Sequence, residues 1–274
     1  MKISATSALV LNWTAPDVWQ SEEAKLYTQG LDLSEGDELL SIFTEDEHYM
    51  HLQAVSNRKF FVRKHALHFM KDCAVKGLKP QVIILGAGIA PLSIELAAYS
   101  SDVKIFDVDK YLMEEKSGYL NRKFPQISFL TCDITDVVAL EQQLSNAGWE
   151  RNSPTLVIME GIIYYLAKEA CAAILSFFAR CKAALAADFA LMPAMVDERA
   201  RDYGTEVFRK ISDRIGLSHI QFYSPGDFSQ MLAASGFQLR QRSLLSEIQQ
   251  EFRGSPLPFE GAEPGWISLV YATS

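Results

Sequence analysis

The chain has few cysteines and no excess of positive charge. Its 274 residues include 26 basic and 34 acidic side chains, a formal net charge of −8, so the basic surface typical of nucleic-acid binding is missing. No CxxC pair occurs, and a chain of this length can be stabilised by its core without disulfides. We therefore expect no nucleic-acid partner and four reduced, structural thiols, at Cys73, Cys132, Cys171 and Cys181.

Long hydrophobic runs are also missing. No stretch reaches the roughly 18 apolar residues that a membrane-spanning helix requires. The nearest candidate, 171–196, is interrupted by Arg180, Lys182 and Asp188. With 49% hydrophobic and 22% charged residues, the composition is that of a globular protein with a large core. We expect a cytoplasmic protein without a membrane partner.

After Pro80, short apolar runs alternate with helical patterns. The runs are continuous, which is typical of strands in a parallel sheet that is covered on both faces. The rhythm therefore predicts a doubly wound α/β fold. The expected strands are 82–85, 103–106, 127–130, 156–159 and 185–191. The expected helices are 91–99, 110–122, 136–147, 167–183, 196–215 and one that begins after Ser224 and stops at Gly236.

The C-terminal part departs from this rhythm. Residues 237–242 and 266–272 predict two further strands, joined by a segment rich in proline and glycine in which we expect no helix. Such a pair should be antiparallel. Five parallel strands followed by this ending give the seven-stranded order of the class I methyltransferase sheet, with an antiparallel C-terminal strand.

The N-terminal part predicts a helical cap. Helical patterns cover 19–30, 45–54 and 57–76. We expect a cap over residues 1–76 and a Rossmann-like core over 77–274, with an insertion at about 189–223. Cap and insertion should form the acceptor pocket, because they lie outside the repeating pattern.

A glycine turn follows the first strand, at Gly86-Ala87-Gly88. Glycines here let the backbone approach a ligand closely, and Pro91 at the first helical position would leave backbone N–H groups pointing into the crevice. Such a crevice suits a nucleotide or an amino-acid carboxylate. The third glycine of a dinucleotide fingerprint is missing, because position 91 is proline, which disfavours a nicotinamide cofactor.

Carboxylates follow the other strands, whose ends converge at the same crevice. Asp107 and Asp109 lie 21 and 23 residues after Gly86, a spacing that suits the ribose hydroxyls of a nucleotide, and we favour Asp109. Asp133 follows the third strand and can accept from an adenine amino group. Glu160 follows the fourth strand among apolar residues, where it requires a cationic partner such as an α-ammonium group.

With these residues in place, the chain resembles the leucine carboxyl methyltransferase-like enzymes, including polyketide carboxyl O-methyltransferases. The strings that carry the resemblance are NRKFFVRKHALHF (57–69), VIILGAGIA (82–90), FDVD (106–109), FLTCDITD (129–136) and PTLVIMEGIIYYL (154–166). The resemblance implies S-adenosylmethionine as the cofactor. Its implied contacts are Arg63 on the carboxylate, Gly86 on the methionine part, Asp109 on the ribose, Asp133 with Ile134 on the adenine, and Glu160 on the ammonium.

One departure from the family is clear. Where the family usually has Gly-Leu-Asp-Thr, this chain has Gly88-Ile89-Ala90-Pro91, so the polar contacts of the Asp-Thr pair cannot be made. Within the basic string we expect Arg63, and not Arg58, to contact the cofactor.

The candidate catalytic residues are Glu160, Tyr164 at the substrate mouth and His219. His48 with His51 and His65 with His68 have helical spacing, but no third ligand converges on them, so we expect no metal.

These observations predict an S-adenosylmethionine-dependent O-methyltransferase that acts on a carboxylate of a small-molecule acid. Three alternatives stay open. One is a phenolic or hydroxyl O-methyltransferase with His219 as base; another is an NAD(P)-dependent oxidoreductase; the third is a catalytically silent S-adenosylmethionine-binding accessory protein.

Overall fold

A computed structural model describes residues 5–120, 123–215 and 220–274. Within these ranges seven strands form one sheet in the order β3-β2-β1-β4-β5-β7-β6. In this sheet β7 runs opposite to the other six strands, which confirms the doubly wound fold with an antiparallel C-terminal strand. The strands are β1 (Gln81–Leu85), β2 (Lys104–Asp109), β3 (Ile127–Thr131), β4 (Thr155–Met159), β5 (Ala184–Ala190), β6 (Gln238–Ser243) and β7 (Ile267–Thr273).

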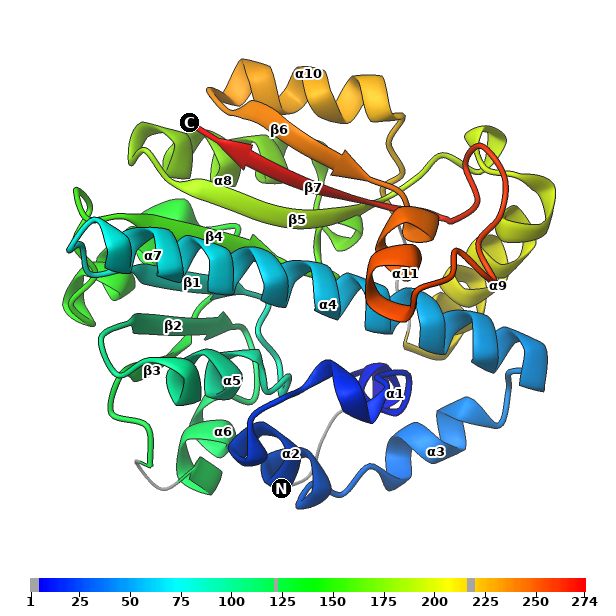
Figure 1. Ribbon diagram of the computed structural model, residues 1–274, viewed down its shortest axis with the longest axis horizontal. Helices are drawn as coiled ribbons and strands as arrows, with labels where there is room; N and C mark the ends of the chain where they lie inside the picture. The colour runs from blue at the N-terminus through cyan, green and yellow to red at the C-terminus, as the bar shows by residue number, and fades with distance from the viewer. Residues whose placement is uncertain (1–4, 121–122, 216–219) are drawn as a thin grey trace.

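Helices cover both faces of the sheet. Figure 1 shows α4 running across the front of the strands, where it contacts α5. On the other face, α8 contacts α7 and α10. The α-helices are α1 (Ala5–Asn12), α2 (Glu22–Gln29), α3 (Ser34–Leu40), α4 (Glu45–Val75), α5 (Leu92–Tyr99), α6 (Met113–Leu120), α7 (Val137–Asn146), α8 (Lys168–Arg180), α9 (Glu198–Ile215), α10 (Pro225–Ser235) and α11 (Leu245–Arg253). Short 3-10 helices are η1 (Pro16–Val18), η2 (Ile163–Tyr165) and η3 (Pro193–Met195).

The cap contains a longer helix than predicted. The two expected helices 45–54 and 57–76 are one helix of 31 residues, α4. It begins with a capping box between Thr44 and Glu47. No glycine or proline interrupts it, and the buried hydroxyl oxygen of Ser56 accepts a hydrogen bond from the Ala15 backbone N–H at 2.9 Å. The polar residues at its centre therefore mark tertiary contacts and not a break.

A helix that we did not expect lies between the last two strands. The segment that we predicted to be loop begins with α11, which ends at Gly254 in a left-handed conformation. Leu245 and Ile248 face the core while the helix packs on α4. Our expectation was wrong because the proline-rich part begins only at residue 256, which leaves room for two helical turns.

One continuous cluster of buried side chains contains residues of both the cap and the sheet, among them Leu9, Phe61, Ile83 and Leu269. The boundary at residue 76 therefore stays a prediction. The four cysteines are free and buried, as expected. The helix α10 has the predicted ends, with Ser224 as N-cap and Gly236 as C-cap.

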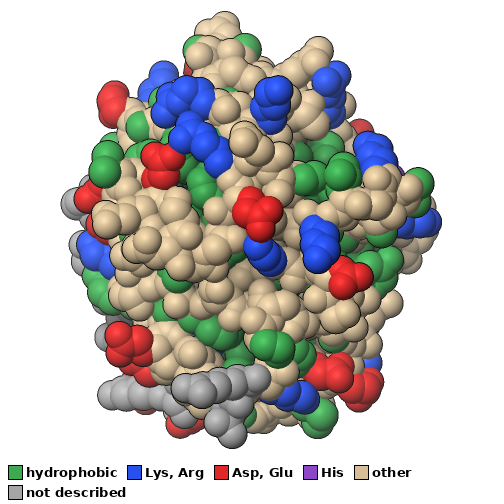
Figure 2. Space-filling model, turned by 90° about the vertical axis from the view of Figure 1, so that its left-hand side faces the viewer, with side chains coloured by type: hydrophobic (Ala, Val, Ile, Leu, Met, Phe, Trp, Pro, Cys, Tyr) green, Lys and Arg blue, Asp and Glu red, His purple; other side chains and the backbone are tan. Residues whose placement is uncertain are grey.

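Figure 2 shows the side of the molecule where the parallel strands begin. Basic and acidic side chains are interspersed on this face, and the apolar ones lie singly or in small groups. Among the helices of the described residues, none is long and apolar enough to cross a membrane.

Candidate functional site

The glycine turn connects β1 to α5 and forms one wall of a pocket. Gly86 and Gly88 both have positive φ angles, of 69° and 47°, which side chains disfavour. The Gly88 backbone N–H donates to Asp109 Oδ2 at 2.9 Å, so the turn and the end of β2 are held together. Pro91 is the N-cap of α5, whereas we predicted it as the first helical residue; the helix begins one residue later, at Leu92.

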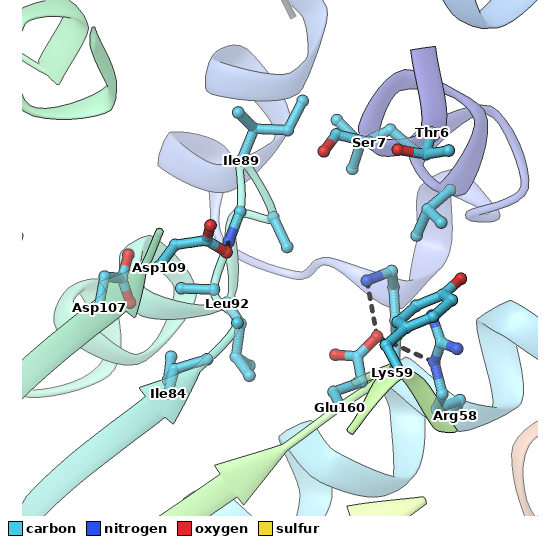
Figure 3. A pocket seen from close by; sticks show the side chains of 18 of the residues that line it. Thr6, Ser7, Arg58, Lys59, Ile84, Ile89, Leu92, Asp107, Asp109 and Glu160 are labelled. Atoms are coloured by element: carbon cyan, nitrogen blue, oxygen red, sulfur yellow. Dashed lines mark hydrogen bonds and ion pairs between the residues drawn. The ribbon is translucent and has the colours of Figure 1, made fainter. Parts of the chain in front are cut away.

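The pocket has a volume of about 280 Å³ and lies at the carboxyl ends of β1, β2 and β4. Figure 3 shows it between two groups of polar residues, with Asp109 and the glycine turn on one side and Glu160 on the other. Thr6 and Ser7 of α1 lie across from them at its rim. The cap thus contributes to this pocket, whereas no residue of the expected insertion at 189–223 that the structure describes is among its lining residues. The lining residues are Thr6, Ser7, Val10, Leu11, Arg58, Lys59, Ile84, Gly86, Ala87, Gly88, Ile89, Ala90, Leu92, Asp107, Asp109, Glu160, Gly161, Tyr164 and Tyr165.

The two aspartates of β2 differ in their partners. Asp109 is half-buried, and its carboxylate accepts from the backbone N–H groups of Gly88 and Tyr111. Asp107 is fully buried, pairs with Lys116 Nζ at 2.7 Å and accepts from Ser93 Oγ at 2.6 Å. The position and partners of Asp109 suit the predicted ribose contact, whereas Asp107 is tied to the core.

Asp133 and Ile134 follow β3 but are not among the residues that line the pocket. The hydroxyl and backbone N–H of Thr135 donate to Asp133, and Lys110 Nζ lies 3.1 Å from it. These hydrogen bonds lower the pKa of Asp133 to about 2. Asp133 thus holds a turn with Thr135, two residues further along the chain, and its contact with an adenine stays a prediction.

Glu160 lies at the end of β4 and has two cationic partners from α4. Its Oε1 is 2.8 Å from Lys59 Nζ and 3.1 Å from Arg58 Nε, and all three side chains are buried. Burial opposes ionisation of Glu160, but Lys59 and Arg58 outweigh this effect and lower its pKa. Burial also lowers the pKa of Lys59, although Glu160 opposes this shift. The cation that the sequence required at Glu160 is thus supplied by the chain itself.

Asp188 of β5 completes this cluster. Its Oδ1 accepts from the Gly161 backbone N–H at 2.6 Å, and its Oδ2 lies 3.7 Å from Arg58 Nη1. The side chain is fully buried, and burial raises its pKa to about 6 against the opposing effect of Arg58. Asp188 therefore holds the turn after β4 in place.

Two tyrosines follow this turn. Arg58 Nη1 donates to the hydroxyl oxygen of Tyr164 at 3.1 Å, and both tyrosines line the pocket. Burial raises the pKa of Tyr164 well above its usual value and that of Tyr165 to about 12. Both hydroxyls therefore keep their protons near neutral pH.

Arg63 lies five residues beyond Arg58 on α4, which places it on another face of the helix, and it is not among the lining residues. Its Nε is 2.5 Å from Oε1 of Glu95, which is itself buried in α5. Glu95 also accepts from the backbone N–H groups of Gln20 and Ser21. Arg58, which we did not expect to contact the cofactor, is among the residues that line the pocket, because α4 packs with that face on β4 and β5.

Two of the four histidines of α4 are packed in the core. His51 is buried among Trp13, Phe43 and Trp266, and His65 stacks on Tyr271. In the described part of the chain no cluster of ligating residues could hold a metal ion. His219, our candidate base, lies outside the described residues.

Sequence reasoning missed Lys59, Asp188 and the rim residues of α1. Glu160 required a cationic partner, and this requirement could have indicated Lys59. The pattern could not tell which basic residue of the string 57–65 would answer it, since that depends on how α4 is rotated against the sheet. Asp188 sits inside an apolar strand, where a buried acid is itself unusual.

The fold is that of the class I S-adenosylmethionine-dependent methyltransferases. The family model of the leucine carboxyl methyltransferases matches residues 19–179, which is more than half of the chain. The chain therefore belongs to the leucine carboxyl methyltransferase family. Membership removes the nicotinamide oxidoreductase from the alternatives. No curated protein sequence matches the chain.

Solved structures support the fold. A DUF574-family protein from Streptomyces avermitilis has a TM-score of 0.66 at 13% identity, covering 98% of this chain and 97% of its own. A proposed methyltransferase from Thermobifida fusca has a TM-score of 0.62 at 14% identity, covering 97% and 94%. The mycolic acid cyclopropane synthase CmaA1, complexed with S-adenosylhomocysteine and CTAB, has a TM-score of 0.51 at 13% identity, covering 87% and 94%.

The residues present fit the two halves of the cofactor differently. Asp109 and the glycine turn offer a nucleoside a carboxylate and a close backbone approach. At the other end, Glu160 and Arg63 already have charged side-chain partners. The nucleoside half therefore fits the site as it stands, whereas the amino-acid half competes with the chain's own groups.

Proposed function

We propose that the protein is an O-methyltransferase that converts a carboxylate of a small-molecule acid into its methyl ester. The observation that carries this proposal is the state of the titratable groups in the pocket wall. Tyr164 and Tyr165 hold their protons, while Glu160 and Asp107 are held by cations. None of these four groups is therefore a free base. A carboxylic acid, with a pKa near 4, is already ionised at neutral pH, so its methylation needs no base.

The buried guanidinium of Arg58 supports an anionic acceptor. It lines the pocket between Tyr164 and Gly161; its Nε and Nη1 already contact Glu160 and Tyr164, and its positive charge in the pocket wall favours an anionic acceptor over a neutral one. S-adenosylmethionine supplies a methyl group that its sulfonium already activates. The chain's own part is to hold the ribose at Asp109, cover the pocket with α1 and align the acceptor, and such alignment is worth several kcal/mol.

The test is a turnover assay with a panel of carboxylic acids and phenols. We expect a methyl ester that base hydrolyses, and a rate with the acid that is nearly flat from about pH 6 to 9 because the acceptor stays ionised. His219→Ala should retain most of the turnover. A base-stable aryl ether whose formation His219→Ala abolishes would replace the carboxylate with a phenol, whose pKa near 10 demands a base.

A catalytically silent accessory protein is the second candidate. It is favoured by Ala90 and Pro91 in place of the family's Asp-Thr pair and by the charged partners at the amino-acid end. Cofactor binding without turnover on any acid or phenol of the panel would support it. We further propose that the protein works in the cytoplasm on a small molecule.

A further inference from the structure

The end of the pocket at Glu160 contains an ammonium group that belongs to the protein. Lys59 Nζ lies 2.8 Å from Glu160 Oε1 and 5.7 Å from the centre of the Trp19 ring. The lysine side chain is 1% exposed, so its ammonium group is desolvated and interacts with this carboxylate and the aromatic ring instead of with water. An α-ammonium group of a ligand would have the same charge and the same donors as Lys59 Nζ.

Two further positions expected to receive the methionine part also contact the chain's own side chains. A side-chain carbon built on Gly86 would meet Cδ1 of Ile162 at 2.2 Å, so Ile162 covers the glycine. Arg63, the expected partner of the cofactor carboxylate, pairs with Glu95 at 2.5 Å. The amino-acid end is thus occupied on three sides by protein groups.

A second ammonium beside Lys59 would place two like charges at one buried carboxylate. Glu160 has Arg58 as a further partner at 3.1 Å, so its charge is already compensated. Bringing in another cation is unfavourable unless Lys59 moves away, and that movement would leave a buried lysine without its carboxylate.

We propose that Lys59 takes the place of the cofactor's α-ammonium group at Glu160, so that the pocket recognises the adenosine and its sulfur substituent but not the amino group. The inference rests on the proposed methyltransferase function, because it concerns how the same pocket holds the cofactor. It is independent of which acceptor is methylated.

The first test uses the unmodified protein and calorimetry at neutral pH. The probes are S-adenosylhomocysteine and its analogue in which hydrogen replaces the amino group. We expect the analogue to bind as tightly as S-adenosylhomocysteine or more tightly, because it loses no contact that Glu160 provides and brings no second ammonium beside Lys59. A preference of more than about thirtyfold for S-adenosylhomocysteine overturns the proposal, since Glu160 would then bind the ligand's ammonium.

The second test removes the lysine charge while keeping its apolar length. Lys59→Met should tighten S-adenosylhomocysteine binding at least about tenfold and leave the analogue within about threefold. The control is Lys64→Met, on the same helix, where the lysine is 38% exposed and pairs with Glu251. We expect no change in either ligand with this control. Weaker binding of S-adenosylhomocysteine to a folded Lys59→Met protein also overturns the proposal.

The comparison of the two ligands on the unmodified protein decides the matter if Lys59→Met fails to fold. Ester formation together with a large preference for S-adenosylhomocysteine would refute this inference alone. Equal binding of the two ligands without ester formation would refute the carboxylate acceptor alone. If neither ligand binds at millimolar concentration, both proposals fail.

Discussion

The two ends of the pocket hold the same kind of side chain in opposite ways. Asp109 accepts from backbone N–H groups, which orient its carboxylate without cancelling its full charge. Glu160 pairs with the full charges of Lys59 and Arg58. Both acids lie at the carboxyl ends of strands in one sheet, on either side of β1, yet one stays available to a ligand and the other is neutralised. A carboxylate at a strand end therefore becomes a ligand site or a structural ion pair according to its partners.

The largest effect should come from Glu160→Gln. This change leaves Lys59 and Arg58 buried with less compensating charge, so we expect the free energy of unfolding to fall by about 3–5 kcal/mol. Urea denaturation measures it, with the exposed Glu169→Gln as control. The comparison breaks if the variant is fully stable and loses affinity for S-adenosylhomocysteine about a hundredfold instead.

Asp109→Asn should show the opposite pattern. We expect a loss of roughly 1.5–3 kcal/mol in binding of S-adenosylhomocysteine, because a charged acceptor for the ribose becomes neutral, with little change in stability. Asp107→Asn should instead lower stability, since Lys116 would lose its buried partner. Calorimetry and thermal unfolding separate the two. If Asp107→Asn is the variant that weakens binding, our choice within the pair is wrong.

Asp188 gives the closed end of the pocket a pH dependence. Its pKa is raised from 3.8 to about 6 in the folded protein, so between these values the folded state binds more protons than the unfolded state. The stability that protonated Asp188 contributes is complete below about pH 4 and is lost as the pH rises through 6. The raised pKa of Arg58 keeps it charged throughout, and the lowered pKa of Glu160 keeps that group ionised over most of the range.

We therefore expect the stability of the unmodified protein, relative to Asp188→Asn, to fall by roughly 1–2 kcal/mol between pH 4 and 6.5. Urea denaturation at several pH values measures the difference between the two proteins. A difference that stays constant over this range would show that Asp188 is not protonated when the protein folds.

The smallest effect distinguishes the two arginines of α4. Arg58→Lys removes the fork that joins Glu160, Tyr164 and Asp188, and it should cost about 1 kcal/mol in stability and reduce turnover. Arg63→Lys keeps a cation beside Glu95 and should change binding of S-adenosylhomocysteine less than about threefold. A tenfold loss of affinity with Arg63→Lys, and none with Arg58→Lys, would restore the contact that the family resemblance implies.

The sheet could be predicted because each strand is a continuous apolar run with its own stop signal. All seven expected strands are present, and each boundary lies within one residue of the observed one, except that β2 extends three residues further, to Asp109. The α11 helix was missed because a glycine-rich and proline-rich segment follows it, and the weight of that composition hid two helical turns. Local sequence patterns were therefore sufficient to predict the elements whose apolar runs recur regularly along the chain.

The partners of the site residues could not be predicted in the same way. The sequence singles out Glu160 and Asp109, since strand ends converge, but the choice among Arg58, Lys59 and Arg63 depends on the rotation of α4 on the sheet. That rotation is set by packing against β4, β5 and β7, which are more than 80 residues away in the chain. A pattern of basic residues on a helix contains no information about such distant contacts.

The unbroken course of α4 has a consequence for how the acceptor preference of this protein can change. Its first half supports the cap and its second half crosses the sheet, with Arg58 and Lys59 between them. Because a helix turns by about 100° per residue, inserting or deleting one residue before Asn57 would rotate the part of α4 that packs on the cap relative to these two side chains. Substitutions of residues in the cap do not change this angle between the two halves of α4. Acceptor preference in this lineage should therefore diverge through substitutions in α1 to α3, while the length of the segment from Thr44 to Arg58 stays fixed.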